Sequence, residues 1–283
     1  MKSGQHLFSG PPKVMGILNL TPDSFSDAGQ FLDSKKAEEH VLQMQEEGME
    51  LLDVGAESTR PGASEISSIE QLRRLEVFFE KTFPLLKVPV SIDTRNPEVA
   101  EFCVKAGVFM LNDVSGLSFE TEKMLGLLKS SHVNYVLMHS RGIPSNMQAL
   151  TEYGDVLKEL ELFFDQKIRL LQEAGVSKER IVLDPGIGFA KMAQHNLKIL
   201  SSLERFKKWG CPLMIGVSRK SFLKEVFGNE NLKTGTELAH LLALQKGVHF
   251  LRVHDVRSAK QTLKFFESFQ NDLIQEAEIN YGT

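Results

Sequence analysis

Cysteine is scarce in this sequence, which has only Cys103 and Cys211. The two show no CxxC spacing and no histidine at metal-ligand spacing, which excludes a disulfide-stapled scaffold and gives no sign of a zinc site. Two reduced thiols are typical of a protein from a reducing compartment. We therefore expect a cytoplasmic protein.

Long apolar runs and a strong charge of one sign are also missing. No run approaches the roughly 18 apolar residues of a membrane-spanning helix, and residues 1–14 lack the apolar core of a signal peptide. The net charge is −4, whereas general nucleic-acid and membrane-surface binders are usually basic. We expect no nucleic-acid and no membrane partner, although a local basic cluster would still allow an anionic small substrate.

Short apolar runs, by contrast, recur along the whole chain. They lack strict alternation of polar and apolar residues, as expected for strands buried on both faces of a parallel sheet. The eight runs are residues 13–20, 51–54, 88–93, 108–113, 134–139, 180–184, 212–218 and 248–254.

Helical patterns separate these runs. Capping residues mark several of the helix starts, namely Ser34, Ser67 with Glu70, and Asn96 with Pro97. The predicted helices are residues 34–48, 67–83, 96–106, 119–130, 151–174, 194–208, 219–227, 233–246 and 255–270.

Strands and helices that alternate in this way, over a chain of this length, predict an α/β fold, a TIM (β/α)8 barrel in a single domain. The domain spans residues 1–283, with its core at about 13–270. An open, doubly wound sheet is the alternative. It is less favoured because no GxGxxG motif follows the first run and no Pro/Gly-rich linker divides the chain.

Polar residues follow each apolar run, at the end of the barrel where active sites lie. Asp93, Asn112 and Asp184 come directly after apolar residues, so we expect their side chains to point into the barrel mouth, where a carboxylate needs a partner. With Lys220 they form a polar ring. This ring suits a heterocycle with a guanidine-like edge, because an aspartate can accept two N–H groups at once.

Cationic groups gather near the end of the chain. Arg252 and His254 are two residues apart on the last strand, so they face the same way, and Arg60 adds a further cation. The loops after strands seven and eight are the usual phosphate site of such barrels, which indicates an anionic leaving group. Asp113 and Asp255 are interpreted instead as helix caps.

Two long loops, residues 21–31 and 57–67, are rich in Ser, Thr, Gly, Pro and Asp. Loops of this kind often close over a substrate. They are also common as plain surface loops, and composition does not decide between the two interpretations.

Eight segments of the chain resemble, in order, the signature segments of the dihydropteroate synthase family. The resemblance runs from about residue 14 to residue 257, and each segment follows a predicted strand. The segments are GILNLTPDSFSDAGQF, DVGAESTRPGA, SIDT, LNDVSG, LMHSRG, LDPGIGFAK, GVSRKSFL and RVHDV.

The resemblance implies a TIM barrel and a transferase that joins 6-hydroxymethyl-7,8-dihydropterin diphosphate to 4-aminobenzoate. The products are 7,8-dihydropteroate and diphosphate, a late step of folate biosynthesis, and the family uses Mg²⁺. Diphosphate would leave a cationic pterin methylene that the aromatic amine attacks. No protein nucleophile is needed, and catalysis is electrostatic support of the leaving group plus positioning.

Carried over position by position, the resemblance also implies ligand groups. The metal contact is Asn19. The pterin-binding residues are Asp93, Asn112, Asp184 and Lys220. The diphosphate ligands are Thr59, Arg60, Arg252 and His254. The aminobenzoate pocket consists of Phe25, Arg60, Pro61, Phe189 and Ser221. The catalytic residues are Asp93, Lys220, Arg252 and His254, with Asp93 placed to stabilise positive charge on the pterin.

The sequence departs from the family pattern at a few positions. Alanine stands where glycine is frequent at Ala28, Ala56 and Ala190, which adds a methyl group and disfavours positive φ. Met192 and Ser140 are further departures. None of these changes removes a charged ligand, and Lys191 has no role that the sequence assigns.

Two other functions fit parts of the sequence. A pterin-binding methyltransferase barrel that uses methyltetrahydrofolate would share the pterin pocket but would not need the STRPGA loop or the Arg252/His254 pair. A barrel that binds pterin without turnover would be expected to lose residues such as Asn19 or Lys220, which are present. The family also implies a homodimer, and the apolar segment 233–269 would allow one.

Overall fold

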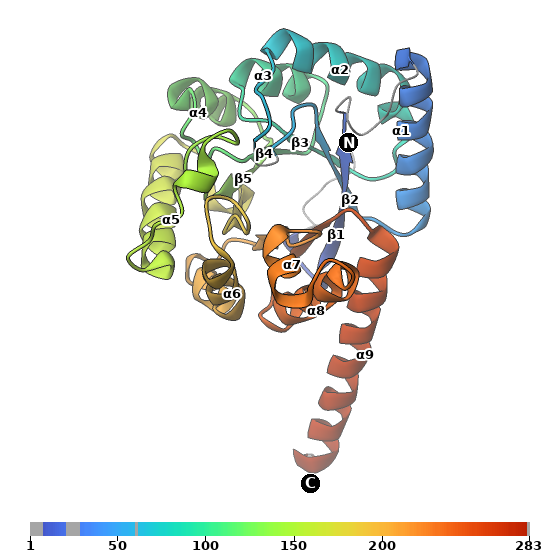
Figure 1. The fold of residues 1–283 in the computed structure, drawn as a ribbon, viewed down its shortest axis with the longest axis vertical. Helices are drawn as coiled ribbons and strands as arrows, with labels where there is room; N and C mark the ends of the chain where they lie inside the picture. Colours follow the sequence, from blue (N-terminus) through green and yellow to red (C-terminus); the bar gives the residue numbers. More distant parts are fainter. Residues whose placement is uncertain (1–7, 21–28, 60–61, 282–283) are drawn as a thin grey trace.

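The computed structural model describes residues 8–20, 29–59 and 62–281. Eight parallel strands surround a central axis, with helices outside them (Figure 1). The strands are β1 Lys13–Asn19, β2 Leu51–Gly55, β3 Val90–Asp93, β4 Met110–Asp113, β5 Asn134–Met138, β6 Ile181–Asp184, β7 Met214–Ile215 and β8 Phe250–Val253.

The helices cover the outside of the sheet and alternate with the strands. They are α1 Gly29–Glu46, α2 Ser68–Lys81, α3 Pro97–Lys105, α4 Thr121–Ser130, α5 Val156–Glu173, α6 Ala193–Ser201, α7 Ser221–Phe227, α8 Leu232–Gln245 and α9 Val256–Tyr281. In the part of the chain that is described, no helix is long and apolar enough to cross a membrane.

The strands pair in the order β6-β5-β4-β3-β2-β1-β8-β7. A single bridge between Leu183 and Leu213 joins the two ends, and Leu183 N–H donates to the Pro212 carbonyl at 2.9 Å. β7 is much shorter than the predicted 212–218, because Pro212 has no N–H to pair and the chain turns at Val217–Lys220. The barrel is therefore nearly closed, as predicted.

The barrel interior is apolar at its amino-terminal end. One layer of seven side chains fills it, and Phe8 packs against it, stacked on the ring of Phe109 and edge-on to the ring of Phe250, each at 5.9 Å. The layer consists of Met15, Leu51, Met110, Val136, Val182, Met214 and Phe250. Polar residues follow two positions further along β2, β4, β6 and β8, namely Asp53, Asn112, Asp184 and Arg252, so the interior changes from an apolar floor to a polar mouth.

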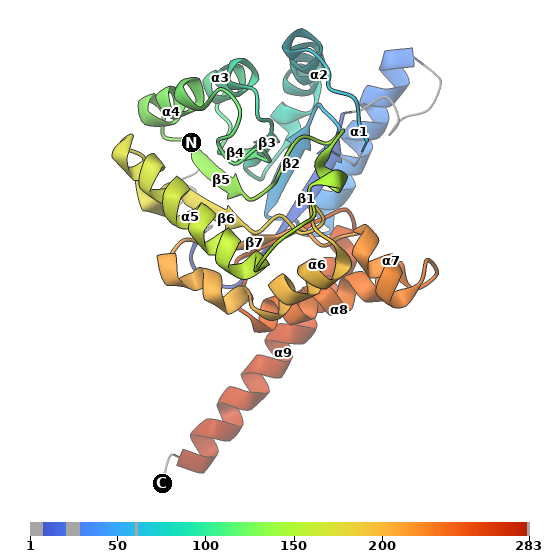
Figure 2. The same cartoon turned by 60° about the vertical axis from the view of Figure 1, so that its left-hand side comes forward.

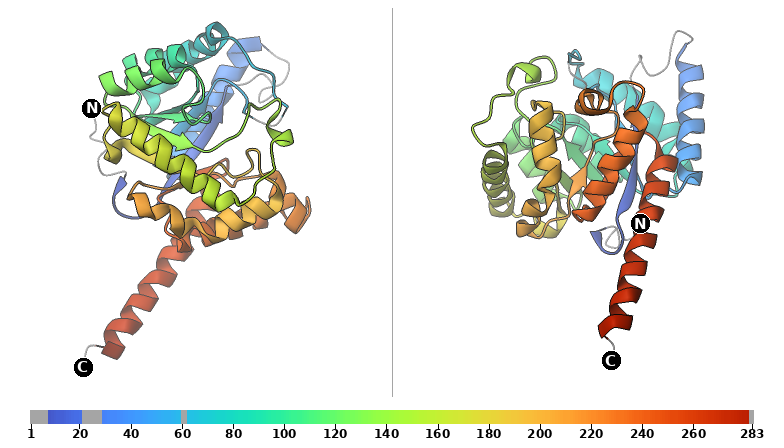
Figure 3. Two further views of the ribbon diagram at one scale, coloured as in Figure 1. Left: turned by 90° about the vertical axis from the view of Figure 1, so that its left-hand side faces the viewer. Right: turned by 60° about the horizontal axis from the view of Figure 1, so that its bottom comes forward.

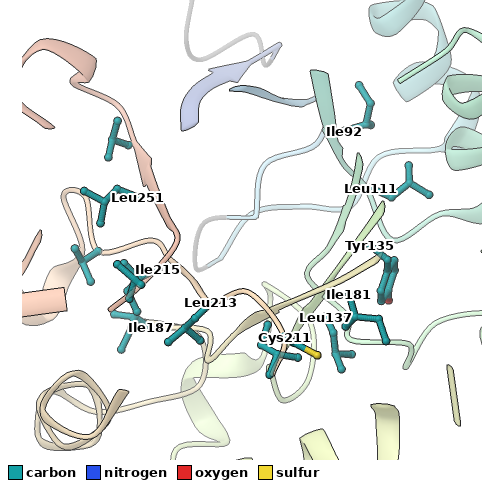
Figure 4. Packing of buried hydrophobic residues seen from close by; sticks show 14 of the residues in the cluster. Ile92, Leu111, Tyr135, Leu137, Ile181, Ile187, Cys211, Leu213, Ile215 and Leu251 are labelled. Atoms are coloured by element: carbon teal, nitrogen blue, oxygen red, sulfur yellow. The ribbon is translucent and has the colours of Figure 1, made fainter. Parts of the chain in front are cut away.

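The larger apolar cluster lies between the strands and the helices. Its strand residues, among them Ile92, Leu111 and Leu251, point outward from the barrel (Figure 4). Since the strands are buried on both faces, they show no alternation in the sequence. This cluster fixes the helices and leaves the carboxyl ends of the strands to carry function.

Helix caps were predicted with mixed success. The Ser67 hydroxyl accepts from Glu70 N–H at 3.3 Å, and the Asn96 side chain accepts from Glu98 N–H at 2.9 Å, as expected. Ser34 was wrongly assigned, because α1 begins at Gly29 and Ser34 lies inside it. The predicted start at residue 151 was wrong too, since Asp155 caps α5.

α9 runs well past the predicted end at residue 270. Its 26 residues correspond to about 39 Å at 1.5 Å per residue. The helix starts against α8, β1 and β8, and its last turns project beyond the barrel (Figures 2 and 3).

Candidate active site

A cavity of about 640 Å³ opens at the carboxyl ends of the strands. The structure brings seven of the predicted site residues to its wall: Asn19, Thr59, Phe189, Lys220, Ser221, Arg252 and His254. A recess of about 10 Å³, the space of about one water, adjoins it and is lined by Asn112 and Asp184 together with Lys220 and Arg252. These groups therefore meet the edge of a ligand whose body lies in the wider cavity. Phe25, Arg60 and Pro61 lie outside the described residues, as does Ala28.

Arg252 lies at the centre of the polar mouth. Its Nε donates to Asp53 Oδ2 at 2.6 Å, and its Nη2 donates to Asp93 Oδ2 at 2.8 Å. Asp53 Oδ2 also accepts from the Asn112 side-chain amide at 2.9 Å. Arg252, predicted as a diphosphate ligand, is therefore bonded to Asp93 of the predicted pterin set and to Asp53, so it links β8 to β2 and β3, and Asp53 extends the link to Asn112 on β4.

Two carboxylates share this one guanidinium, so the group carries a net negative charge. Burial raises the pKa of Asp93 to about 7; Arg252 opposes this shift, and the Asp53 charge adds to it. Burial likewise lowers the pKa of Lys220 to about 8, and the Arg252 charge lowers it further while Asp184 and Asp93 oppose it. Burial thus shifts the pKa values of an acid and of a base in this site toward neutral pH.

Several buried acceptors of this layer have no protein partner among the described residues. They are Asp53 Oδ1, Ser91 Oγ, Asp93 Oδ1 and Asn112 Oδ1. A buried acceptor without a donor costs about 1–3 kcal/mol. Of these residues only Asn112 lines the recess, so its oxygen is the one suited to a ligand that brings N–H or O–H groups, whereas Asp53, Ser91 and Asp93 line neither space.

Asp184 ends β6 and is 5% exposed. Its Oδ1 accepts from Gly186 N–H at 2.8 Å, which fixes the carboxylate at the wall of the recess. Burial raises its pKa, although that hydrogen bond and the Lys220 charge oppose the rise. The predicted position at the barrel mouth is confirmed by this placement.

Phe189 and Lys220 pack together at the junction of the recess and the wider cavity. The Lys220 Nζ lies 4.2 Å from the centre of the Phe189 ring, a cation–π arrangement. A Cβ on Gly188 would lie 3.0 Å from Lys220 Cδ, so glycine lets the lysine pass over the loop. Phe189 also packs with Met138, Met147 and Ala190.

His254 and Asn19 lie on the opposite side of the cavity. The Ser218 hydroxyl is 3.2 Å from His254 Nδ1 and accepts from His254 N–H at 3.3 Å, which orients the ring. Thr59 lines the same cavity. The predicted diphosphate side is thus assembled around one space, as far as its residues are described.

Asp255 is confirmed as a helix cap, whereas Asp113 was wrongly assigned, because α4 is capped at Glu120 and Asp113 holds the turn that follows β4. Asp113 accepts from Ser115 N–H and Leu117 N–H, and from the Tyr135 hydroxyl at 2.6 Å. Asp255 accepts from Ser258 N–H at 2.9 Å, at the start of α9. Neither belongs to the cavity wall.

Three residues of the site were missed from the sequence. Asp53 is fully buried, and the available signal was a lone carboxylate inside an apolar strand, which must have a partner. Lys191 is a buried lysine in the β6 loop, and Met147 lines the cavity from the loop after β5. For these two the sequence held no signal, because only the fold brings them to the site.

The described residues contain no group of three or more His, Cys, Asp or Glu that could hold a metal ion. Asn19 offers a single amide oxygen at the cavity wall. Such a donor fits Mg²⁺ only as a cation that keeps waters and binds largely through substrate phosphates.

Comparison with known proteins agrees with this geometry. The family model described as pterin binding enzyme matches residues 15–254. Dihydropteroate synthase from Synechocystis is 41% identical over 266 residues, which is 92% of each chain. A Xanthomonas albilineans dihydropteroate synthase solved with 4-aminobenzoic acid has a TM-score of 0.85 and 39% identity, covering 92% of this chain and 93% of its own. The same organism's enzyme in complex with 7,8-dihydropteroate has a TM-score of 0.80 and 34% identity, covering 92% of this chain and 93% of its own.

The chain is therefore a barrel of the pterin-binding enzyme class. Within that class it belongs to the dihydropteroate synthase family, as its relatives over nearly its whole length show. The family, the fold, the reaction and the transferase class predicted from the sequence are confirmed. The roles of individual site residues stay predictions.

Proposed function

We propose that this chain condenses 6-hydroxymethyl-7,8-dihydropterin diphosphate with 4-aminobenzoate in folate biosynthesis. The observation that carries the proposal is the pair of joined spaces, a polar recess and a wider cationic mouth, with Lys220 and Arg252 lining both. A flat heterocycle and an anionic leaving group need such adjacent compartments.

The recess is suited to the N–H-rich edge of a pterin. Asp184 stands fixed at its wall, and the unpartnered Asn112 oxygen is an acceptor that such a ligand would satisfy. Asp93 lines neither space in this structure and is joined to the recess through its bond to Arg252. The negative charge shared by Asp53 and Asp93 also favours positive charge on the pterin as the leaving group departs.

The mouth is suited to the leaving group. The C–O bond to diphosphate breaks with its electron pair going to diphosphate, and the amine nitrogen of 4-aminobenzoate then bonds to the pterin methylene and loses a proton. Arg252, His254 and Thr59 would hold the diphosphate from β8 and the β2 loop, with Arg60 added by prediction. Mg²⁺, held by Asn19 and the diphosphate itself, would neutralise the developing charge.

The aminobenzoate is placed against Phe189, Ser221 and Met147 at the same mouth, with Phe25 and Pro61 added by prediction. Ser221 begins α7 beside Lys220, so a polar end of the substrate would lie near α7 and the ring near Phe189. Catalysis then consists of holding the amine in line with the pterin methylene.

The test is diphosphate release by the purified chain with Mg²⁺. Release is expected only when both substrates are present, and Lys220→Ala should lose turnover by more than it loses pterin binding. No release with both substrates would overturn the proposal. Tight methyltetrahydrofolate binding without dihydropteroate formation would favour the methyltransferase alternative, and pterin binding without any turnover would favour a binding protein. Chelation of the metal should weaken diphosphate binding in calorimetry as well as activity.

We propose that the chain acts as a homodimer and that it is located in the cytoplasm. Leu238 and Leu242 on α8, and Phe265 and Phe269 on α9, are four residues apart in each pair and 44–63% exposed, so each helix presents an apolar face to solvent. α8 and α9 pack against each other, which makes one surface for a second copy. The two buried free cysteines suit a reducing compartment.

A further inference from the structure

Lys191 is a charged side chain that the mechanism above does not use. It follows the β6 loop and is 4% exposed. Its Nζ lies 2.9 Å from His139 Nδ1, 3.0 Å from the Gly186 carbonyl and 3.0 Å from the Phe189 carbonyl. The buried Lys191 amine therefore joins His139, just after β5, to two carbonyls of the loop after β6, those of Gly186 and Phe189.

The Gly186 end of this arrangement leads to the pterin recess. Lys191 donates to the Gly186 carbonyl, while the Gly186 N–H donates to Asp184 Oδ1 at 2.8 Å. Gly186 has φ +67°, and a Cβ there would meet the His139 carbonyl oxygen at 1.9 Å, so the loop lies directly on the end of β5. The lysine therefore holds the carbonyl side of Gly186, the residue whose N–H holds the Asp184 carboxylate.

The Phe189 end leads to the aminobenzoate wall. Lys191 donates to the Phe189 carbonyl, and the next residue, Ala190, is held fully buried at φ +50°. A non-glycine residue in this region costs about 1–3 kcal/mol and persists only where its surroundings impose it. The Lys191 bond to the Phe189 carbonyl, which spans Ala190, is such a constraint, and it holds the backbone from which the Phe189 side chain leaves the loop.

The pairing is compatible with either protonation state of the amine. An ammonium donates to both carbonyls and to His139 Nδ1, whereas a neutral amine donates to the carbonyls and accepts from an Nδ1–H. Burial lowers the pKa of Lys191 to about 7 and the pKa of His139 well below its usual range. The contacts therefore do not depend on one charge state.

We propose that Lys191 is a positioning residue that sets the Asp184 carboxylate and the Phe189 ring, and so aligns the two substrates, by tying the β6 loop to the end of β5. The proposal rests on the proposed function, because the two positioned groups are its substrate contacts. It does not make Lys191 a catalytic residue, since its amine bonds to protein atoms.

Lys191→Met tests the proposal, since it keeps the length of the side chain and removes the donors. The KM for 4-aminobenzoate is expected to rise about tenfold or more and the Kd of the pterin substrate severalfold, with kcat at saturation within about threefold. Lys167→Met is the matched control. It removes a similar Lys–carbonyl bond, Lys167 Nζ to Leu117 O at 2.8 Å, on the neighbouring β4 loop. The control should lose stability and keep its KM.

A lowered Tm with unchanged KM and Kd in Lys191→Met would overturn the proposal, because it would make the lysine a structural residue only. If Lys191→Met does not fold, Lys191→Gln, which keeps two N–H donors on a shorter chain, is assayed in the same way. Failure of both variants to fold would also overturn it. Absence of turnover in the wild-type protein would count against the proposed function, whereas these outcomes concern Lys191 alone.

Discussion

Asp53 is a fully buried carboxylate that the cavity does not reach, and its effect on the site passes through two neighbours. It accepts from Arg252 Nε at 2.6 Å and from the Asn112 amide at 2.9 Å. Asp53→Asn keeps the shape and removes the charge, so Arg252 would be paired with Asp93 alone. We expect kcat/KM for the pterin diphosphate to fall about 10- to 100-fold, which corresponds to about 1.4–2.8 kcal/mol. Steady-state kinetics with varied pterin substrate measures this.

Ser91→Ala is the control for Asp53→Asn. Ser91 lies beside Asp53 in the β2–β3 pairing, is fully buried, and its Oγ has no partner among the described residues. Removing that hydroxyl leaves the Arg252 bonds in place, so kinetics should stay close to wild type. Equal losses in both variants would show that the layer responds to any change of packing and that the Asp53 charge has no special part.

His240 on α8 is a single buried residue that makes the stability of the folded chain depend on acid pH. Both ring nitrogens are buried without a partner among the described residues, and burial lowers the pKa of His240 to about 4. Since the unfolded chain binds the proton more readily, this residue leaves stability unaffected by pH above about 6.5 and lowers it progressively as the pH falls from about 6.5 to about 4. His240→Leu removes the proton site.

The free energies of unfolding of wild type and His240→Leu should therefore diverge on acidification. Urea titrations at pH 7.5 and pH 4 are expected to show the variant gaining about 3 kcal/mol relative to wild type over that range. At pH 7.5 its stability should be equal or higher, because two unpaired buried nitrogens are gone. A constant difference between the two pH values would mean that the ring reaches solvent in the folded state.

At the scale of elements, α2 holds the starting points of two active-site loops. Arg74 Nη1 donates to the Ala56 carbonyl at 2.9 Å and to the Leu20 carbonyl at 3.2 Å, just beyond the ends of β2 and β1. Glu70 holds the guanidinium at 2.8 Å, and the Leu20 N–H donates to the Gly55 carbonyl at 2.8 Å. One arginine thus joins two strand ends next to Asn19.

Arg74→Met should loosen both strand ends. We expect a loss of about 1–3 kcal/mol in stability, the range for hydrogen bonds to charged groups, and faster hydrogen exchange of the Leu20 amide. Arg73→Met is a close control, because Arg73 lies on the same helix and pairs with the same Glu70 but is half exposed. The control should leave the Leu20 amide protected; similar exchange in both variants would contradict the role of Arg74.

The sequence predicts elements better where a local rule decides them. The caps at Ser67 and Asn96 were correct because a side chain and a nearby N–H suffice. The length of β7 and the end of α9 were wrong because a two-residue strand and a projecting helix depend on pairing and packing with distant segments. Tertiary contacts override a weak local pattern at those places.

The residues of the site also divide into those that a local pattern predicts and those that only tertiary contacts bring together. Asp184 and Asn112 could be found because one ends β6 and the other lies next to the last residue of β4, and the ends of parallel strands meet at one face. Asp53, Lys191 and the position of Arg252 could not, because their partners lie on strands and loops far away in the sequence. The sequence predicts which polar residues stand at the strand ends. It does not predict which of them bond to one another, because that depends on how the closed barrel brings the strands together.

At the scale of the whole molecule, the apolar face of α8 and α9 is the surface on which we expect a second copy. Phe265 is 63% exposed and Leu242 is 51% exposed, and both lie outside the barrel wall that surrounds the cavity. Phe265→Glu with Leu242→Glu would place carboxylates in a buried contact, where an unpaired charge is costly. We expect sedimentation velocity to give about twice the chain mass of 31.8 kDa for wild type and the chain mass for this variant.

Leu162→Glu is the matched control, because Leu162 on α5 is 60% exposed and lies on a different helix of the barrel wall. It should sediment as wild type does. A monomeric wild type, or a dimer that survives Phe265→Glu with Leu242→Glu, would contradict the assignment of this face. Since neither substituted residue lines the cavity, turnover per chain should persist in the monomer unless the second copy supports the mouth of the barrel.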